Sequence, residues 1–369
     1  MKVATILGTR PEIIKLSRVI YTFDNYLEHF VINTNQNFDK KLNANFFEEL
    51  GLKKPKYNLS CSDNNFAKTL SNIISKVDEV LENEKPDAIL IYGDTHSGLS
   101  AIVAKKKKIP IFHMEAGNRC FDNNVPEEIN RKIIDHLSDI NIVLTENARN
   151  YLISEGFPQH KIFNVGSFVP EISIFYKKNI NKSKIMNKLK LYKSNYILAS
   201  IHREENLDIN DYLSKIMYSL NQLSITSKKK IIFSTHPRTK TKLLNNRIKF
   251  DPKKIILSDP FGYFDYIKLA KNSFITISDS GTIVEDCATY GFKAIMLRDT
   301  NERPEGFDNG NLIMVSPNSN NLIKAVDVLK LKKSDENLNQ YSDDIYVSKK
   351  ILNIVLSYTS FVNKYTWYK

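Results

Sequence analysis

Short apolar runs alternate with amphipathic stretches along almost the whole chain. The runs span four to six residues and lack a strict alternation of apolar and polar positions. Strands of this kind, separated by helices, are typical of a parallel sheet that is covered on both faces. Strands are predicted at Val3–Leu7, Phe30–Asn33, Ala88–Tyr92, Ile109–His113, Ile140–Leu144 and Ile162–Val165 in the first half, and at Tyr196–Ile201, Lys230–Ser234, Lys254–Leu257, Phe274–Ile277, Ala294–Leu297 and Leu312–Val315 in the second half.

The six predicted strands in each half indicate an α/β fold with two Rossmann-like, doubly wound domains. Helices are predicted between them, for example at Asn65–Leu81 and Ser319–Leu331. Because the segment Pro170 to Ser194 is rich in Lys and Asn and weakly patterned, we place the domains at 1–169 and 170–369. A further helix is predicted from Asp344 to Tyr358, and the sequence leaves open whether it packs back against the first domain.

A tight turn follows the first predicted strand. Gly8 permits a sharp change of direction, and Pro11 fits the start of a helix, where a missing N–H costs little. Arg10 and Lys15 are then expected near the N–H groups that begin the helix, which favours the binding of an anion. The alternative is an ordinary strand-to-helix turn whose two cations are only solvated.

A second turn of the same kind follows a strand in the other half. We place Ser280 at the N-cap with Gly281 beside it, so that the hydroxyl and the N–H groups can hold a phosphate. Glu285 and Asp286 come one turn later and can accept hydrogen bonds from a ribose diol. A capped helix with a surface acidic pair is the alternative. Together the two turns indicate one phosphorylated ligand in a cleft between the domains.

Acidic residues follow three segments of the first half. Asp94 and Glu115 each lie just beyond a predicted strand, and Glu127 begins a predicted helix. Several carboxylates beside cations suit proton abstraction and return, because burial and mutual repulsion can separate their pKa values. Structural roles are the alternative: Glu127 can complement a helix dipole, and the other two can hold a neighbouring loop.

In the second half, His202 and His236 follow neighbouring strands. Their spacing matches no zinc signature, so no metal is predicted, and His202 is expected to bind a phosphate or to transfer a proton. A histidine satisfied by its surroundings is the alternative for His236. Phe261 and Tyr266 belong to an aromatic loop that can enclose a base, although core packing explains such rings nearly as well. Arg303 can close over the ligand.

Charge and cysteine content narrow the class of partner. The formal net charge of +12, from 53 Lys and Arg against 41 Asp and Glu, is dispersed along the chain, so nucleic acid is not expected as a partner. No apolar run approaches the ~20 residues that cross a bilayer, and no secretory signal is visible, so no membrane partner is expected. Three widely spaced cysteines indicate reduced thiols in a cytoplasmic protein of 369 residues.

Taken in order, these segments resemble the non-hydrolysing UDP-N-acetylglucosamine 2-epimerase family, whose fold is two Rossmann-like domains facing a central cleft, as in glycosyltransferases of the B type. The matching motifs are Gly8–Lys15, Gly93–Thr95, His113–Gly117, Pro126–Arg131, His202–Asn206, Asp279–Asp286 and Arg298–Glu305. The resemblance implies an active site formed by Arg10, Lys15, Asp94, Glu115, Glu127, Arg131 and His202. It also implies that UDP is held by Ser280, Gly281, Thr282 and Asp286, with Arg303 nearby and Phe261 and Tyr266 beside the uracil.

Other segments are similar to a capsule and O-antigen branch of the family, among them Asn118–Asp122 and Pro260–Tyr266. That branch forms UDP-N-acetyl-L-fucosamine from UDP-2-acetamido-2,6-dideoxy-L-talose. The resemblance therefore favours this L-talose derivative as the substrate. Related members interconvert UDP-GlcNAc and UDP-ManNAc or act on UDP-2,3-diacetamido uronates, and these sugars are the alternatives. Thr282 departs from the family, which usually has a second glycine at this position.

The resemblance implies inversion at C2 of a UDP-2-acetamido sugar. A base removes the C2 proton, UDP leaves C1 to give a glycal-type intermediate, and UDP returns while C2 is reprotonated from the other face. This chemistry needs no metal or redox cofactor. A UDP-sugar glycosyltransferase and a non-catalytic UDP-sugar binding protein are the rival functions. A homodimer is expected by default.

Overall fold

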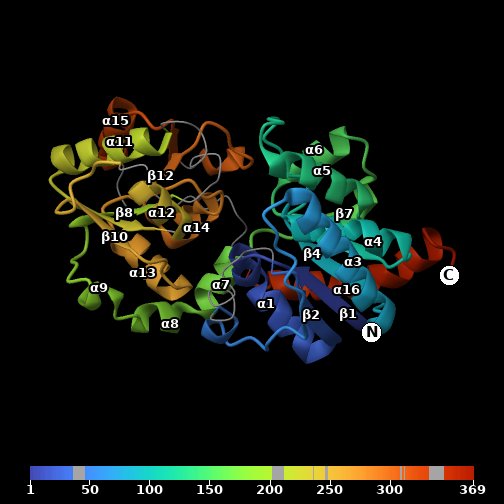
Figure 1. Cartoon of the computed structure of the whole chain (residues 1–369). Coiled ribbons are helices and arrows are strands. Elements are labelled where there is room, and N and C mark those ends of the chain that lie inside the picture. Colours follow the sequence, from blue (N-terminus) through green and yellow to red (C-terminus); the bar gives the residue numbers. More distant parts are fainter. Residues whose placement is uncertain are drawn as a thin grey trace. The chain divides into compact units, whose positions relative to one another are not determined.

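The structure is a computed structural model that describes residues 1–35, 46–201, 212–235, 237–245, 248–307, 310, 312–331 and 345–369. It confirms the α/β class with two parallel sheets. The contacts divide the chain into unit 1, Met1–Ile172 with Tyr341–Lys369, and unit 2, Ser173–Gln340 (Figure 1). The sequence-based boundaries, 1–169 and 170–369, stay a prediction.

The sheet of unit 1 is parallel, with the strand order β3-β2-β1-β4-β5-β6-β7. Its strands are β1 (Lys2–Leu7), β2 (Glu28–Asn33), β3 (Tyr57–Asn58), β4 (Ala88–Tyr92), β5 (Ile111–Met114), β6 (Ile140–Val143) and β7 (Ile162–Asn164). The prediction of six strands in this half is wrong by one. The strand that was missed, β3, has two residues, which are too few to form a recognisable apolar run.

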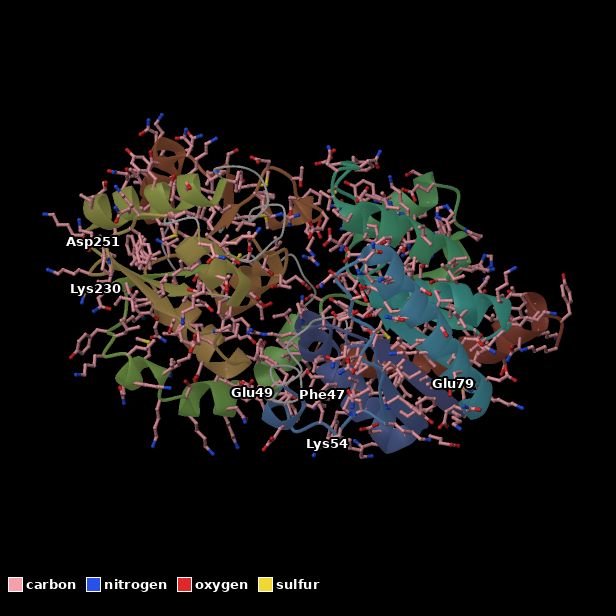
Figure 2. The ribbon with its side chains drawn as sticks, viewed as in Figure 1. Phe47, Glu49, Lys54, Glu79, Lys230 and Asp251 are labelled. Carbon is pink, nitrogen blue, oxygen red and sulfur yellow. The ribbon has the colours of Figure 1, made fainter. Side chains whose placement is uncertain are left out.

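The helices of unit 1 are α1 (Arg10–Tyr26), α3 (Phe66–Glu84), α4 (Ala101–Lys106), α5 (Pro126–Leu137), α6 (Glu146–Ser154) and α16 (Val347–Tyr365), with short 3₁₀ turns η1 (His96–Ser100) and η2 (Gln159–Lys161). Helix α7 (Val169–Phe175) begins in unit 1 and ends in unit 2. Helix α3 buries Ile73 and Val77 in the same cluster as Ile89 of β4, whereas Glu79 lies on its outer side (Figure 2). This helical period is the reason why its sequence reads as amphipathic.

Helix α16 lies against α1, far from it in sequence (Figure 1). Thr22 of α1 donates a hydrogen bond of 3.1 Å to the Ser348 hydroxyl of α16. The Glu171 carboxylate in α7 accepts hydrogen bonds from the Ser348 backbone N–H (2.8 Å) and hydroxyl (2.5 Å). By its contacts, this helix belongs to unit 1.

The sheet of unit 2 is also parallel, with the order β10-β9-β8-β11-β12-β13. Its strands are β8 (Tyr196–Ser200), β9 (Lys230–Ser234), β10 (Ile255–Ser258), β11 (Thr276–Ser278), β12 (Ala294–Leu297) and β13 (Leu312–Val315). The connecting elements are α8 (Lys177–Lys182), α9 (Ile185–Lys188), α11 (Tyr212–Ser227), α12 (Pro237–Asn245), α13 (Tyr263–Asn272), α14 (Ile283–Tyr290), η3 (Pro304–Phe307) and α15 (Ser319–Leu331).

Helices α11 and α15 lie side by side over one face of this sheet (Figure 1). Their apolar residues, such as Ile216 and Leu322, share a buried cluster with Ile197 and Ile231 of the strands. Tyr196 is on the alternate face of β8, and its hydroxyl donates to the Leu269 carbonyl of α13 at 2.6 Å. Both faces of the sheet are therefore covered. Among the described residues, no helix is long and apolar enough to cross a membrane.

In each sheet, the strand order reverses at one point. In unit 1, β1 and β4 are neighbours there, and in unit 2, β8 and β11 are neighbours. Turns that follow such neighbouring strands diverge to opposite faces of the sheet and leave a crevice at its carboxyl edge, where doubly wound proteins bind ligands. The turns at 8–9, 93–95 and 279–282 all lie at these two points.

Candidate active site

Glu12 holds the turn between β1 and α1. Its carboxylate accepts hydrogen bonds from the backbone N–H groups of Gly8 (2.8 Å) and Thr9 (2.6 Å). Its second oxygen accepts a 2.8 Å hydrogen bond from the Thr95 hydroxyl, which follows β4. Burial outweighs these hydrogen bonds and raises the pKa of Glu12 to about 7. The N–H groups of Gly8 and Thr9, which directly precede the helix, are therefore occupied by a carboxyl group of the protein itself.

Asp94 stands at the carboxyl end of β4 and is held from α5. Arg131 donates to its Oδ2 from Nη2 (2.7 Å) and from Nε (3.1 Å), and Asn130 donates to its carbonyl at 2.9 Å. Arg131 is 3% exposed, whereas the Asp94 side chain is 31% exposed. Asp94 is therefore fixed in direction yet accessible to a ligand.

Glu115, at the end of β5, has a left-handed backbone with φ of 65°. This conformation costs a residue other than glycine about 1–2 kcal/mol. Its carboxylate passes over Gly93, where a Cβ atom would lie 3.2 Å from Oε2, and Asn118 donates to Oε1 at 3.4 Å. This backbone conformation brings the Glu115 carboxylate close to Gly93, the residue before Asp94. Strained backbone conformations of this kind are common at functional positions.

A buried charged network lies beneath these two strand ends. The His113 ring contacts the Asp135 carboxylate through Nδ1 and the Gly93 carbonyl through Nε2, both at 2.8 Å. Arg119 donates to Asp135 at 2.8 Å and binds Glu155 through two nitrogens. Burial opposes the ionisation of Asp135, but the His113 and Arg119 interactions outweigh it and hold its pKa below the ordinary value.

Glu128 fixes the loop that leads into α5. Its buried carboxylate binds Arg131 at 3.0 Å and accepts from the N–H groups of Cys120 (3.1 Å) and Phe121 (3.2 Å). Although burial opposes its ionisation, these donors keep its pKa below the ordinary value. Glu128 therefore connects the loop, Arg131 and Asp94 in one chain of contacts.

The remaining predicted residues of unit 1 lie on the same elements. The Arg10 guanidinium stacks on the Phe46 ring, 4.5 Å from its centroid. Lys15 is 3% exposed on α1, and Glu127 is half-buried in the first turn of α5. The two histidines predicted for the site from the second half of the sequence, His202 and His236, lie outside the described residues.

The turn of unit 2 differs from our expectation at the start of its helix. Helix α14 begins at Ile283 with Thr282 as the N-cap, so the placement of Ser280 at the N-cap is wrong. The Ile283 and Val284 N–H groups donate to the carbonyls of Ser280 and Gly281, which forms a tight turn before the helix. The hydroxyls of Ser280 and Thr282 lie 3.0 Å apart, so both belong to this turn.

Gly281 is in contact with a buried group of ions. A Cβ atom at this position would lie 2.2 Å from Glu302 Oε1 and 2.6 Å from Arg303 Nη1. Glu302 accepts hydrogen bonds from Arg298 (3.0 Å) and Arg303 (3.5 Å), and all three are less than 7% exposed. Arg303 therefore lies beside the turn and is buried behind the glycine, and its predicted closure over a ligand stays a prediction.

The other described residues predicted for the site of unit 2 lie in α14 and at the start of α13. Glu285 is completely buried and Asp286 is 8% exposed, which contradicts the alternative of a surface acidic pair. Phe261 is buried and Tyr266 half-buried at the start of α13.

Sequence reasoning missed three residues that hold the site of unit 1 together: Glu12, Thr95 and Glu128. One signal for Glu12 was present, because Thr9 followed by an acid three residues later is the capping-box pattern. That pattern predicts a helix start and does not predict the contact with Thr95. Chemically, unit 1 offers accessible carboxylates beside fixed cations, and unit 2 offers a hydroxyl-lined turn.

Known proteins match this chain over nearly its full length. The UDP-N-acetylglucosamine 2-epimerase family matches residues 22–356. The structure of UDP-N-acetylglucosamine 2-epimerase from Rickettsia bellii is 46% identical, covers 100% of both chains and has a TM-score of 0.89. The enzyme from Methanocaldococcus jannaschii, solved in complex with UDP-GlcNAc and UDP, is 37% identical over 96% of this chain and 99% of its own, with a TM-score of 0.91.

A relative with a different sugar is also similar. The UDP-2,3-diacetamido-2,3-dideoxy-D-glucuronate 2-epimerase of Pseudomonas aeruginosa is 33% identical over 307 residues, 82% of this chain and 84% of that protein. The resemblance that the motifs indicated is confirmed at the level of the family, and the L-fucosamine branch is not confirmed by these names. With its two parallel-sheet domains and these matches, the chain belongs to the UDP-N-acetylglucosamine 2-epimerase family, whose members are isomerases.

Proposed function

We propose that the protein inverts C2 of a UDP-2-acetamido sugar by elimination and re-addition of UDP, with UDP-GlcNAc and UDP-ManNAc as the favoured pair. The C2 proton passes to a carboxylate while the C1–O bond breaks, which leaves a C1–C2 double bond and free UDP. Re-addition of UDP at C1 and of a proton to the opposite face of C2 completes the inversion. Asp94, Glu115 and Glu127 are proposed as the acids and bases, and Arg10, Lys15 and His202 as the groups that steady the diphosphate. Arg131 is proposed to contribute to substrate binding by holding Asp94 in place.

One observation carries this proposal. The Asp94 carboxylate is oriented by Arg131, and its side chain is 31% exposed. The Glu115 residue has a strained backbone, and its carboxylate lies over Gly93, the residue before Asp94. Two carboxyl groups at neighbouring strand ends supply what proton removal and return on two faces of one carbon require. The choice of sugar rests on the relatives, since several of the similar proteins are named for UDP-N-acetylglucosamine.

Isotope exchange tests the reaction directly. Incubated with UDP-GlcNAc in deuterated water, the protein should place deuterium at C2 of both UDP-GlcNAc and UDP-ManNAc, because the proton returns from a group in exchange with solvent. Mass spectrometry and proton NMR measure the label. A glycosyltransferase or a non-catalytic binding protein leaves C2 unlabelled, and a hydrolysing enzyme releases one UDP for each sugar. The proposal is contradicted if one of these results is obtained with every UDP-2-acetamido sugar that is tested.

The same assay determines the sugar. Two alternative substrates are tested beside UDP-GlcNAc. The sequence motifs indicate UDP-2-acetamido-2,6-dideoxy-L-talose, and the relative from Pseudomonas aeruginosa indicates a UDP-2,3-diacetamido uronate. The substrate with the highest kcat/KM identifies the biological class. A preference for the L-talo sugar would favour the L-fucosamine branch over the UDP-GlcNAc pair.

UDP is assigned to the turn of unit 2. Ser280 and Thr282 supply hydroxyls for the phosphates, and Asp286, which is 8% exposed, supplies a carboxylate for the ribose. Glu285 is completely buried, so its predicted contact with the ribose is not included in this proposal. His236, Phe261, Tyr266 and Arg303 are proposed to complete the nucleotide site. Localisation in the cytoplasm and a homodimeric state stay predictions.

Replacing Gly281 with alanine should weaken UDP binding about tenfold or more, because the new Cβ atom would lie 2.2 Å from Glu302 and displace the Glu302–Arg303 pair. Calorimetric titration with UDP measures the Kd. Gly51→Ala is the control, since open space surrounds Gly51 and its cost is confined to backbone strain. An unchanged Kd in Gly281→Ala would show that this turn does not hold UDP.

A further inference from the structure

Glu12 is a buried carboxyl group at the point where the strand order of unit 1 reverses, and the proposed reaction assigns it no role. It is 2% exposed and connects two segments that follow neighbouring strands. One segment is the turn of Gly8 and Thr9, whose N–H groups both donate to Glu12 Oε2. The other is the loop of Asp94, through the Thr95 hydroxyl and Glu12 Oε1.

These partners suit both protonation states of the carboxyl group. Oε2 can accept from the two backbone N–H groups whether Glu12 is ionised or neutral. Oε1 faces a hydroxyl, which is able to donate to a carboxylate or to accept from a carboxylic acid. A proton on Oε1 therefore costs no hydrogen bond. It reverses the bond to Thr95, whose own hydrogen then becomes available to another acceptor.

The surroundings keep the two states close in free energy. Burial disfavours the carboxylate, the donors favour it, and the resulting pKa of about 7 lies near neutrality. The other charged residues on the two segments are Arg10 and Lys15 of α1 and Asp94. His96, on the same loop, packs its ring against Phe66 of α3.

We propose that Glu12 is a positioning residue that takes up a proton from solvent when a diphosphate binds at the turn of Gly8 to Lys15. The new O–H donates to the Thr95 oxygen, and the Thr95 hydrogen turns toward the bound ligand. The driving force is repulsion, because a diphosphate beside Glu12 disfavours a second negative charge there. Thr95 is half-buried and directly follows Asp94, so the change at its hydroxyl occurs one residue from a proposed acid or base. This proposal rests on the proposed function, since it requires a UDP-sugar as ligand.

Calorimetry with UDP-GlcNAc tests proton uptake without turnover as a readout. Titrations at about pH 8 in two buffers with different ionisation heats give the number of protons bound with each ligand. UDP-GlcNAc is suitable because its diphosphate does not titrate in this range. The wild-type protein should take up a measurable fraction of a proton per ligand, and its Kd should rise between about pH 6 and about pH 9, because the ligand favours protonated Glu12.

Two variants assign the proton to Glu12. In Glu12→Gln the amide oxygen can accept from the backbone and the amide nitrogen can donate to Thr95, so this variant imitates the protonated state. It should bind UDP-GlcNAc at about pH 6 like the wild type, take up no proton, and lose the pH dependence of Kd. In Thr95→Val the carboxylate loses a donor, so the pKa of Glu12 rises and the maximum of proton uptake moves to higher pH.

Glu171→Gln is a matched control. Glu171 also accepts from a backbone N–H and a hydroxyl, those of Ser348, and it has no part in the proposed reaction. It should leave the proton uptake unchanged. Ligand binding without uptake in the wild type, or equal uptake in Glu12→Gln, overturns the role of Glu12 even if C2 exchange occurs. Uptake that is lost in Glu12→Gln, without C2 exchange on any sugar, overturns the proposed reaction and leaves the role of Glu12 standing.

Discussion

Replacing Asp94 with asparagine should lower the kcat of epimerisation by about 10²–10⁴-fold, because an amide of the same shape cannot accept or return the C2 proton. KM should change little, since Arg131 can still donate to the amide oxygen at the position it now occupies, 2.7 Å from Oδ2. The rate of deuterium incorporation at C2 measures the effect on the chemical step. Equal losses in kcat and kcat/KM are the expected signature of a group that acts only in the transition state.

Asp139→Asn is the control for this substitution. Asp139 is also a buried carboxylate of unit 1, but it binds Lys105 (2.6 Å) and the N–H of Ile111, at the opposite end of β5 from Glu115. Its loss should reduce stability and leave kcat within about twofold of wild type, because the carboxyl-edge site is untouched. If Asp94→Asn retains near-normal turnover, the assignment of Asp94 as acid or base is wrong and Glu115 or Glu127 takes its place.

The largest expected loss of stability comes from Asp135→Asn. This substitution leaves the His113 ring and the Arg119 guanidinium buried without the carboxylate that joins them. Breaking one partner of a buried ion pair costs about 3–5 kcal/mol of unfolding free energy. Urea unfolding followed by circular dichroism measures the shift. Glu155→Gln is the comparison, because Glu155 is 28% exposed and its pair with Arg119 should contribute only about 1 kcal/mol.

The pH dependence of this difference has a definite sign. Because the folded-state pKa of Asp135 is lowered, its contribution is present above the ordinary carboxyl pKa and is lost as the pH falls through the lowered value. The stability gap between wild type and Asp135→Asn should therefore shrink on acidification. A gap that stays constant down to strongly acidic pH would show that the cost arises from packing instead of charge.

The fold was largely predictable because its strands are buried on both faces. The predicted bounds of β4, β9, β12, β13 and α15 are those that the structure has. The end of β11 was predicted one residue too early, at Ile277. Ser278 belongs to the strand because it pairs with β8 and β12, and hydropathy does not indicate such pairing. The two-residue strand β3 exists only through its pairing with β2.

The site was predictable in its residue types and not in its connections. Strand-end positions identified Asp94, Glu115 and the turn at Ser280, because parallel strands bring their carboxyl ends to one edge. The contact between Glu12 and Thr95 joins residues 83 positions apart, and no local pattern contains it. The start of α14 was misplaced because a serine before a glycine looks like an N-cap, whereas the chain makes a tight turn first.

The return of the chain to unit 1 has a consequence for the order in which the protein is made. Helix α16 packs on α1, yet all of Ser173–Gln340 is translated between them. While unit 2 leaves the ribosome, the side of α1 around Thr22 is uncovered, and unit 1 lacks its closing helix. We expect unit 2 to complete its folding before unit 1, although the synthesis of unit 1 begins first. During this time, the side of α1 that α16 later covers stays exposed.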